Sequence, residues 1–304
     1  MKKIPNFWKK KNHLLSVFLY PLSLLYLLAI KLNKLCKKFF IFNDIKIVCV
    51  GNLYLGGTGK TPLVKKIYDE IKNKKKICVI KKYNKNQIDE IKYLDCFTDF
   101  ITAKSRVKAI KKAKIKGYEL AVLDDGMQDY SFKKNISILC IKSRQGFGNE
   151  TILPAGPLRE RIKNIKKYNL ALINGDKRKD LENTIKKYNQ NIKIFYSKYK
   201  IINHSQFLNN DYLAFSGIGD NHNFFELLKE NGIKVCKTKE FEDHYKFRDS
   251  DILNLIDLSK KNNLSLITTE KNFFNINKKY HDKINYVKLD LIINDLEKFI
   301  NEID

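Results

Sequence analysis

The sequence has few acidic residues, and this shortage is its most evident compositional bias. It contains 33 Asp and Glu against 59 Lys and Arg, a formal net charge of +26. Such an excess can indicate a nucleic-acid partner, an anionic membrane or a phosphorylated substrate. However, Lys, Asn and Ile are frequent in every segment, as A/T-rich codon usage would produce. We therefore attribute most of the charge to composition, with attraction to a membrane surface as a second contribution.

Paired cysteines are also lacking. None of the six cysteines belongs to a C-x-x-C pair, which argues against a zinc ribbon or a thioredoxin-type site. Cys49, Cys78 and Cys140 lie in apolar runs, where a thiol behaves as a small hydrophobic group. This usage gives no indication of an oxidising compartment, so a cytosolic location is the default expectation.

An apolar segment from Leu14 to Ile30 carries no charged residue and is flanked by lysines on both sides. It is barely long enough to span a membrane, and Pro21 predicts a kink or a break near its middle. No small-residue cleavage site follows, which disfavours a signal peptide. Lysines on both flanks suit a helix lying in a cytoplasmic leaflet, and a spanning helix stays open. We expect residues 1–40 to form a membrane-associating helical segment rather than a core helix.

Glycines gather in one informative place, the sequence IKIVCVGNLYLGGTGKTP at residues 45–62. An apolar strand followed by glycines and a helix start is typical of a loop that binds nucleotide phosphates through backbone N–H groups. Lys60 would reach the β- and γ-phosphates, and the Thr61 hydroxyl would ligate Mg²⁺. The usual pattern has glycine where this chain has Tyr54, so an ordinary glycine-rich turn is the alternative. The residues expected to bind the nucleotide are Gly56, Gly57, Thr58, Gly59, Lys60 and Thr61.

A second apolar run, at residues 120–123, ends in the two carboxylates Asp124 and Asp125. In phosphate-loop enzymes, an aspartate at the end of such a strand holds Mg²⁺ directly or through water. Alone, the pair followed by glycine would predict a simple turn. Together with the phosphate loop, it favours a metal site made of Thr61, Asp124 and Asp125.

Short apolar runs alternate with helical patterns from residue 45 onward, which predicts a parallel sheet covered by helices on both faces. Strands are expected at 45–50, 77–80, 120–123, 136–141 and 170–173, and in a second series at 192–196, 212–215, 234–236, 264–268 and 286–289. Helices are expected at 60–72, 105–116, 181–188, 223–230, 249–261 and 296–303. No linker rich in Pro or Gly separates the halves. We place the boundary in the polar stretch 197–210, with domains at residues 41–200 and 201–304.

Several segments, in order, resemble the tetraacyldisaccharide 4′-kinase (lipid A 4′-kinase) family. They are YPLSLLY near the N-terminus, VGNLYLGGTGKTP (50–62), LDDGMQ (123–128), FGNETILPAGPLRE (147–160), INGD (173–176), FSGIGDNHNFF (215–225), FEDHYKF (241–247) and TTEKN (268–272). The block at 147–160 is the most specific because it is long and has no generic role. The family's phosphate loop likewise lacks the first glycine, so Tyr54 fits the resemblance.

The resemblance implies a P-loop NTPase-like parallel-sheet domain plus a second, smaller α/β domain, with a membrane-associating N-terminal helix. It implies ATP and Mg²⁺ as cofactors. The expected reaction is phosphorylation of the 4′-hydroxyl of a lipid A disaccharide-1-phosphate precursor at the cytoplasmic face of the bacterial inner membrane. We expect a monomer that works at that membrane surface and binds no nucleic acid.

The resemblance also assigns the catalytic groups. Asp89 acting with His244 from the second domain would take the proton from the sugar hydroxyl, since a carboxylate orients a histidine ring and supports its charged form. A surface or structural histidine is the alternative. Lys60 and Asp125 complete the expected catalytic set. A site with parts from both domains would close around its substrate.

The chain departs from the family pattern in places. The family's S-R-G-Y-G and G-D-E-P stretches stand here as IKKYN (80–84) and QIDE (87–90), a shortened segment in which Asp89 matches the acid. The family's T-E-K-D ends here in Asn272. Arg144, Arg159 and Arg161 lie around the block at 147–160, where they can bind phosphates in bidentate pairs or lie on the surface.

Two other functions stay open. A P-loop NTPase of the partitioning or GTPase type would need a guanine-specifying N-K-x-D or a second loop lysine, and neither occurs in a suitable place. A membrane-anchored basic nucleic-acid-binding protein would fit the charge, but no helix-turn-helix, RRM or zinc motif accompanies it. Preference for GTP would favour the first, and salt-sensitive binding to duplex DNA the second.

Overall fold

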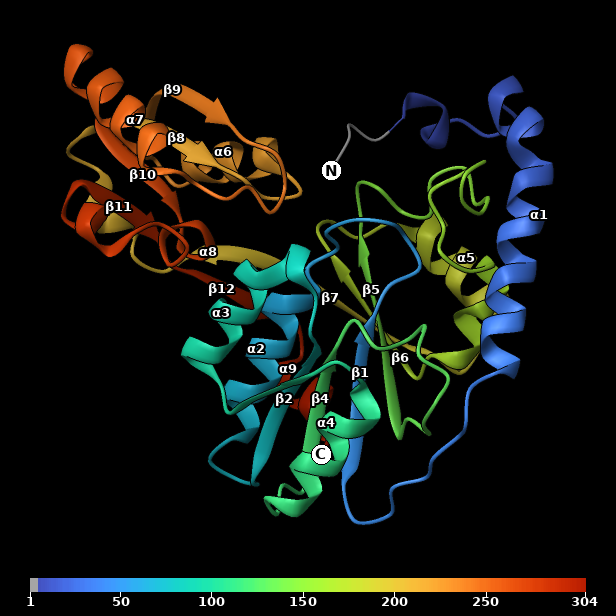
Figure 1. Cartoon of the computed structure of the whole chain (residues 1–304). Coiled ribbons are helices and arrows are strands. Elements are labelled where there is room, and N and C mark those ends of the chain that lie inside the picture. Colours follow the sequence, from blue (N-terminus) through green and yellow to red (C-terminus); the bar gives the residue numbers. More distant parts are fainter. Residues whose placement is uncertain (1–4) are drawn as a thin grey trace. The chain divides into compact units, whose positions relative to one another are not determined.

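The structure, a computed structural model, describes residues 5–304 and divides them into two compact units (Figure 1). The larger unit contains residues 5–83, 97–198 and 292–304, and the smaller contains residues 84–96 and 199–291. Both are α/β, each with its own sheet, so the fold class predicted from the sequence is confirmed.

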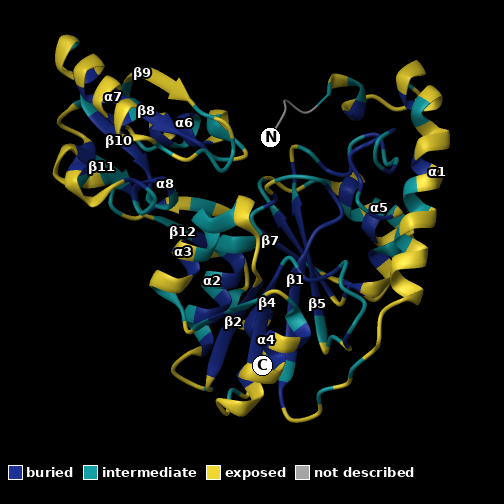
Figure 2. Ribbon diagram, in the orientation of Figure 1, coloured by how far each residue is buried: buried dark blue, intermediate teal, exposed yellow. Residues whose placement is uncertain are grey.

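In the described part of the chain, the larger unit carries an eight-stranded sheet with the order β12-β7-β6-β5-β1-β4-β2-β3. The pairs from β7 to β3 are all parallel. Its strands are β1 (Lys46–Gly51), β2 (Ile77–Lys82), β3 (Phe100–Ala103), β4 (Leu120–Asp124), β5 (Ile136–Lys142), β6 (Leu170–Asn174), β7 (Lys193–Ile201) and β12 (Leu289–Ile293). Strands β1 and β4 are almost entirely buried, as a sheet covered on both faces requires (Figure 2).

The helices of this unit position the carboxyl edge of the sheet. They are α2 (Lys60–Ile71), α4 (Arg106–Ile115), α5 (Lys179–Tyr188), α9 (Leu296–Asn301) and the 3-10 helix η3 (Ile162–Lys167). The connections β1-α2-β2 and β3-α4-β4 cross the sheet in opposite directions. Because such crossovers are right-handed, α2 and α4 cover opposite faces. The carboxyl ends of β1 and β4, which are parallel neighbours, therefore lie side by side between the helix layer that contains α2 and the one that contains α4.

Within residues 84–96 and 199–291, the smaller unit has a four-stranded parallel sheet with the order β11-β10-β8-β9. Its strands are β8 (Asp211–Ser216), β9 (Lys234–Glu240), β10 (Ser265–Thr269) and β11 (Ile284–Val287). Its helices are α3 (Ile88–Phe97), α6 (Asn221–Glu230), α7 (Asp249–Lys261), α8 (Glu270–Phe273) and the 3-10 helices η2 (Lys85–Gln87), η4 (His204–Phe207) and η5 (Lys278–Lys283). Separate apolar clusters form around Phe224 of α6 and Leu255 of α7.

The division of the chain differs from the contiguous domains 41–200 and 201–304 expected from the sequence. Residues 84–96 group with the smaller unit, and residues 292–304 group with the larger. Residues 292–304 belong to the larger unit because of their packing: β12 lies beside β7, and α9 contacts α2. Such pairing joins segments far apart in the sequence, so local patterns do not reveal it.

The N-terminal segment is the 3-10 helix η1 (Asn6–Lys9) followed by α1 (Leu14–Leu35), and both group with the larger unit. Helix α1 is long and apolar enough to cross a membrane, and most of its surface is exposed (Figure 2). It runs through Pro21 without the expected break. Within its 22 described residues, the buried ones are Ser16 and Ser23. Both face the block at 147–160, which supports the helix on either side of the proline.

Candidate functional site

The glycine-rich loop between β1 and α2 has the backbone that an anion site needs. Gly56 has φ +119° and Gly59, the N-cap of α2, has φ +85°. Glycine adopts these angles without the strain that other residues incur. Lys60 is the first residue of α2, so the unpaired N–H groups and the positive dipole end of the helix face the loop. Between these glycines, the Thr58 hydroxyl is buried with no hydrogen-bond partner in residues 5–304.

Tyr54 stands where the usual phosphate loop has glycine, and its setting explains the difference. It is buried and forms an antiparallel bridge with Leu158. The N–H of Leu55 donates to Pro157 O at 2.8 Å, and the N–H of Arg159 donates to Leu53 O at 2.7 Å. The first half of the loop is thus an extended segment paired with the block at 147–160. A position with an extended backbone accommodates any residue, so glycine is not required there.

Asn52, directly after β1, supports the loop from inside. Its Nδ2 donates to Tyr54 O at 2.6 Å and to Gly56 O at 3.2 Å. Its own backbone oxygen accepts from Gln128 Nε2 at 3.1 Å. Asn52 is fully buried, so these bonds are shielded from water and hold the loop in one conformation.

Asp124, at the end of β4, lies beside the start of α2. Its Oδ2 accepts from Thr61 Oγ1 at 3.0 Å and pairs with Lys81 Nζ at 2.6 Å. Lys81 comes from β2, whose register places it opposite Asp124. Asp124 is completely buried, and its Oδ1 has no hydrogen-bond partner among the described residues. A buried carboxylate oxygen without a partner is costly, and a bound cation is the usual remedy.

Asp125 follows with a left-handed backbone, φ +57°, and turns its side chain toward cations. Its Oδ1 lies 2.8 Å from Arg159 Nη1 and 4.0 Å from Lys60 Nζ, and its backbone oxygen accepts from Arg106 Nη2. Burial alone would raise the pKa of Asp125, but Lys60 and Arg159 outweigh it and hold the pKa well below its ordinary value. Asp125 is therefore ionised at neutral pH.

In the smaller unit, Asp89 and His244 form a second polar cluster. His244 Nδ1 lies 2.9 Å and 2.8 Å from the two oxygens of Asp89, and Lys271 Nζ lies 2.7 Å from Asp89 Oδ2. Burial would raise the pKa of Asp89, but the hydrogen bond from His244 and the charge of Lys271 hold it well below its ordinary value. An ionised carboxylate only accepts hydrogen bonds, so Nδ1 of His244 carries the proton.

The other nitrogen of this ring is available for chemistry. His244 Nε2 lies 3.7 Å from Asp243 Oδ2 and 3.9 Å from Glu90 Oε1, beyond hydrogen-bond distance. The residue has φ +62°, a backbone conformation that is uncommon outside glycine and occurs more often at functional sites. Asp89 and His244 belong to the same unit, so this pair does not span the two domains as the sequence suggested.

Comparison with known proteins identifies the family. The model of the tetraacyldisaccharide-1-P 4′-kinase family, LpxK, matches residues 15–95 and 89–304. The tetraacyldisaccharide 4′-kinase of Pelagibacter ubique is 38% identical over 306 residues, which cover 99% of this chain and 97% of that protein. The chain belongs to the LpxK family. The resemblance carried by the motifs is thereby confirmed.

Other relatives agree. The tetraacyldisaccharide 4′-kinase of Wigglesworthia glossinidia brevipalpis is 34% identical, covering 94% of this chain and 83% of that protein. A crystal structure of LpxK from Aquifex aeolicus, described as an "apo" form in complex with ATP, has a TM-score of 0.71 at 22% identity and covers 95% and 98% of the two chains. At that identity the likeness concerns the fold.

The structure of this chain brings together most of the site residues that its sequence predicted. Lys60, Thr61, Asp124 and Asp125 meet at one edge of the larger sheet, and Gly56, Gly57, Thr58 and Gly59 form the adjoining loop. Of the three arginines left open, Arg159 joins this cluster while Arg144 and Arg161 are exposed.

Sequence reasoning missed Asn52, Lys81, Arg106 and Lys271. A signal existed for Lys271, which lies inside the TTEKN motif of the LpxK resemblance. Lys81 gave none, because its partner Asp124 is identified only by the strand order, in which β4 lies between β1 and β2.

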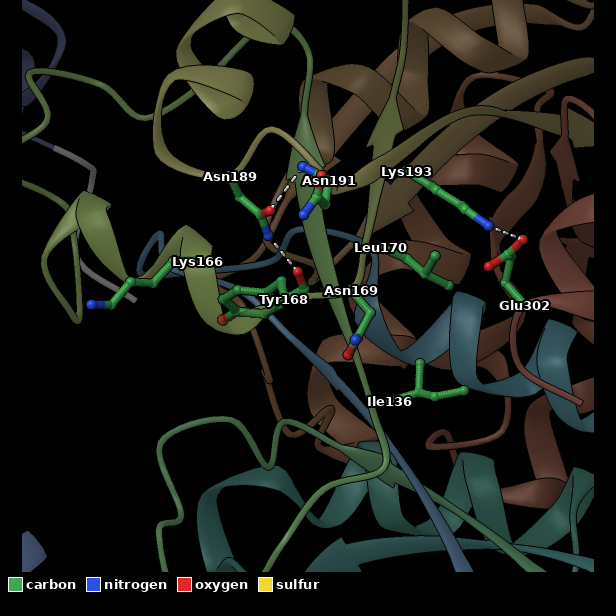
Figure 3. A pocket seen from close by; sticks show the side chains of 9 residues that line it. All are labelled: Ile136, Lys166, Tyr168, Asn169, Leu170, Asn189, Asn191, Lys193 and Glu302. Atoms are coloured by element: carbon green, nitrogen blue, oxygen red, sulfur yellow. Dashed lines mark hydrogen bonds and ion pairs between the residues drawn. The ribbon is translucent and has the colours of Figure 1, made fainter.

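A cavity of about 350 Å³ lies elsewhere in the larger unit and is not a candidate site (Figure 3). It is found at the starts of β5, β6 and β7, whereas the phosphate loop follows the end of β1. Several of its polar groups pair with one another. Asn189 Nδ2 donates to Tyr168 O at 2.8 Å, Asn189 Oδ1 accepts from Asn191 N at 3.2 Å, and Lys193 pairs with Glu302.

Proposed function

We propose that this chain is a kinase that transfers the γ-phosphoryl group of ATP to the 4′-hydroxyl of a lipid A disaccharide-1-phosphate precursor. Family membership supplies the reaction class. The observation that carries the assignment to residues is the contact of Thr61 with Asp124 beside the glycine-rich loop. These are the parts that phosphate-loop enzymes use.

The nucleotide phosphates bind along the loop of residues 56–61. Backbone N–H groups of the loop and the N-terminus of α2 offer donors to the phosphate oxygens. Lys60 Nζ lies 4.0 Å from Asp125 Oδ1, so the carboxylate holds the ammonium group in place before the nucleotide binds. This preorganisation lets Lys60 stabilise the charge that builds on the β,γ-bridge without reorganising.

The residues at the end of β4 fit a magnesium ion. Asp124 Oδ1 is buried without a partner, and the Thr61 hydroxyl lies against the same carboxylate. Both are hard oxygen donors of the kind that Mg²⁺ prefers. Thr61 and Asp124 would hold the ion, with Asp125 beside them. When bound, Mg²⁺ neutralises charge on the β- and γ-phosphates.

The small number of protein ligands agrees with a magnesium site in which the bound nucleotide supplies further ligands. No group of three or more His, Cys, Asp or Glu side chains able to hold a metal ion occurs in residues 5–304. A phosphate-loop magnesium site needs no such group, because phosphate oxygens and water supply the remaining ligands.

Arg159 contributes a planar guanidinium next to the loop. Its Nη1 contacts both Asp125 Oδ1 at 2.8 Å and Asn52 Oδ1 at 3.0 Å, and these bonds fix its orientation. A guanidinium matches two phosphate oxygens at once, which a lysine cannot do. We propose that Arg159 binds the γ-phosphoryl group while it is transferred from the β,γ-bridging oxygen of ATP to the 4′-oxygen of the acceptor.

The Asp89–His244 pair acts as the base. As the 4′-oxygen attacks phosphorus, its proton passes to Nε2 of His244, and the β,γ-bridging oxygen leaves with the bonding electrons. The imidazolium that forms is stabilised by Asp89 through the Nδ1–H bond. Lys271 keeps Asp89 ionised for this purpose.

Helix α1 associates with the membrane that holds the acceptor. Its side chains Leu14, Phe18 and Leu25 are more than half exposed, which is costly for a helix in water and favourable in lipid. A reaction that consumes ATP places the enzyme on the cytoplasmic face of the inner membrane.

Transfer is tested with the full chain, ATP, Mg²⁺ and a detergent-dispersed disaccharide-1-phosphate acceptor. Mass spectrometry should show the acceptor heavier by one phosphate, with ADP formed in equal amount. The matched control is an acceptor whose 4′-position is blocked as a methyl ether. Phosphate on the blocked acceptor, or ADP formed at the same rate without any acceptor, would contradict the proposal.

A further inference from the structure

A groove of about 520 Å³ runs along the C-terminal half of α1, within the larger unit. One wall is α1, and the other is formed by Tyr130 and by the chain from Glu160 to Lys167. None of its lining residues belongs to the glycine-rich loop or to the Asp124–Asp125 pair, although Glu160 directly follows Arg159 in the chain.

The α1 wall changes character along its length. Leu24, Leu27 and Leu28 line the first part, and Lys31 and Lys34 line the next turns. These positions follow the three- and four-residue spacing that puts side chains on one helix face. At 1.5 Å per residue, the apolar and the basic zones together extend over roughly 15 Å. This length and polarity match the upper part of a phospholipid, with an acyl chain next to a phosphate.

The basic zone continues on the opposite wall. Lys34 Nζ lies 5.0 Å and Lys167 Nζ 4.9 Å from the ring centre of Tyr130, so both ammonium groups face the same side chain. Lys167 Nζ also lies 3.3 Å from the Tyr130 hydroxyl. Arg161, which is exposed, adds a further charge at the rim.

The acidic side chain in the groove does not cancel this charge. Glu160 is buried, accepts from Asn164 Nδ2 and lies 3.4 Å from Lys167 Nζ. Among the described lining residues, four cations, namely Lys31, Lys34, Arg161 and Lys167, therefore stand against one carboxylate. Such a groove attracts an anion that also carries an apolar portion.

We propose that this groove binds one anionic phospholipid of the bilayer, with its phosphate between Lys34 and Lys167 and an acyl chain along Leu24 and Leu28. Charge complementarity selects this occupant over an apolar protein helix, which would leave the cations unpaired. The exposed apolar surface of α1 brings the groove to the lipid. The inference rests on α1 lying in a membrane and is independent of the transfer reaction.

The test is native mass spectrometry of the full chain released from nanodiscs that contain phosphatidylcholine and phosphatidylglycerol. The wild type should retain one phosphatidylglycerol per chain in preference to phosphatidylcholine. Lys31→Ala combined with Lys34→Ala should weaken retention about tenfold or more. The matched control, Lys10→Ala with Lys38→Ala, removes the same charge from exposed positions outside the groove and should retain the lipid.

A second pair of variants tests shape without changing charge. Leu28→Trp fills part of the groove and should also lose the lipid, whereas Leu25→Trp, at a non-lining position of the same helix, should keep it. Equal loss in the groove and control variants, or equal retention of the two lipids by the wild type, would overturn the proposal. Displacement of the lipid by the disaccharide-1-phosphate acceptor would also overturn it, since the groove would then belong to the substrate. Phosphoryl transfer, assayed in phospholipid-free detergent, is scored separately.

Discussion

Lys271 Nζ and His244 Nδ1 contact the same oxygen of Asp89, at 2.7 Å and 2.8 Å. The three residues come from α8, from the loop after β9 and from the first turn of α3. Burial would lower the pKa of Lys271, but Glu90 and Asp89 raise it above its ordinary value. Lys271 is therefore charged and fixes the carboxylate that orients the histidine.

Replacing Lys271 should slow the reaction without affecting nucleotide binding. Lys271→Gln removes the charge that holds Asp89, and displacing a catalytic base by up to about 1 Å costs about 10- to 100-fold in rate. We expect kcat to fall by that factor while KM for ATP stays unchanged. Lys278→Gln, at an exposed position in the same unit, is the control and should behave as wild type. A change confined to KM for ATP would contradict the assignment.

Asp89 should make stability sensitive to acid. Its pKa is lowered in the folded state, so its contribution is fully present above the ordinary value of 3.8 and is lost as pH falls below it. We expect Asp89→Asn to reduce the free energy of unfolding by about 2–3 kcal/mol at pH 7, because Lys271 loses the carboxylate at 2.7 Å and keeps only the more distant Glu90, at 3.6 Å. Urea unfolding of both proteins from pH 7 to pH 3 should show this difference shrink below pH 3.8. A difference that stays constant would count against the ion pair.

Lys60→Ala should abolish transfer and leave the protein folded. The ammonium group of Lys60 stabilises transition-state charge, and losing such a group costs at least about 100-fold in kcat. Lys72→Ala, at the exposed end of α2, removes the same charge and should retain full activity. Circular dichroism would establish that both variants are folded. Turnover of Lys60→Ala near the wild-type rate would rule out the phosphate-loop mechanism.

Asp124 should affect stability as well as activity. Asp124→Ala removes the carboxylate that Lys81 Nζ contacts at 2.6 Å, and losing one member of a buried ion pair costs about 3–5 kcal/mol. The double variant Asp124→Ala with Lys81→Met should recover much of this stability while staying inactive. Thermal unfolding separates the two effects, and a double variant less stable than Asp124→Ala would show that the pair is not coupled.

Arg159→Lys should reduce kcat although the charge is kept. Lysine cannot reproduce the two-point contact of a guanidinium, and we expect a loss of about 10- to 100-fold. Arg144→Lys, an exposed position near the same block, is the matched control. If both variants retained wild-type kcat, Arg159 would have no role in the transfer.

Ser23→Val should loosen α1 from the larger unit. The hydroxyl of Ser23 donates to Ile152 O at 2.9 Å and accepts from Ala155 N at 3.2 Å, and both are buried. Valine has no hydroxyl, so the buried Ala155 N–H loses its acceptor, while Ile152 O keeps its bond from Gly156 N; the unpaired N–H costs about 1–3 kcal/mol. Hydrogen exchange at Ala155 should accelerate, whereas Leu25→Val, on the exposed side of α1, should leave it unchanged.

Local patterns predicted the elements of this fold well because most are bounded by local signals. Helix α2 was expected at 60–72 and occupies Lys60–Ile71, since glycine marks its start. The missed elements include β3, α3, α8 and β12. Strand β3 has four residues, and α3 lies in the segment that departs from the family pattern.

The candidate site was predictable where motif residues are close in sequence and not where the sheet brings distant ones together. Lys60 and Thr61 follow from one loop, whereas Lys81 meets Asp124 through strand order. The role of the block at 147–160 also depended on the structure. Its backbone pairs with the phosphate loop through Pro157, and its Ile152 and Ala155 hold α1.

The path of the chain through residues 84–96 has a consequence for dissecting the protein. These residues carry Asp89 into the unit that holds His244 and Lys271, although more than a hundred residues of sequence intervene. Cleavage near residue 200 would give two polypeptides, one with the carboxylate and the other with the histidine. Neither fragment would contain both Asp89 and His244. Recovery of activity would require the two fragments to reassemble in solution.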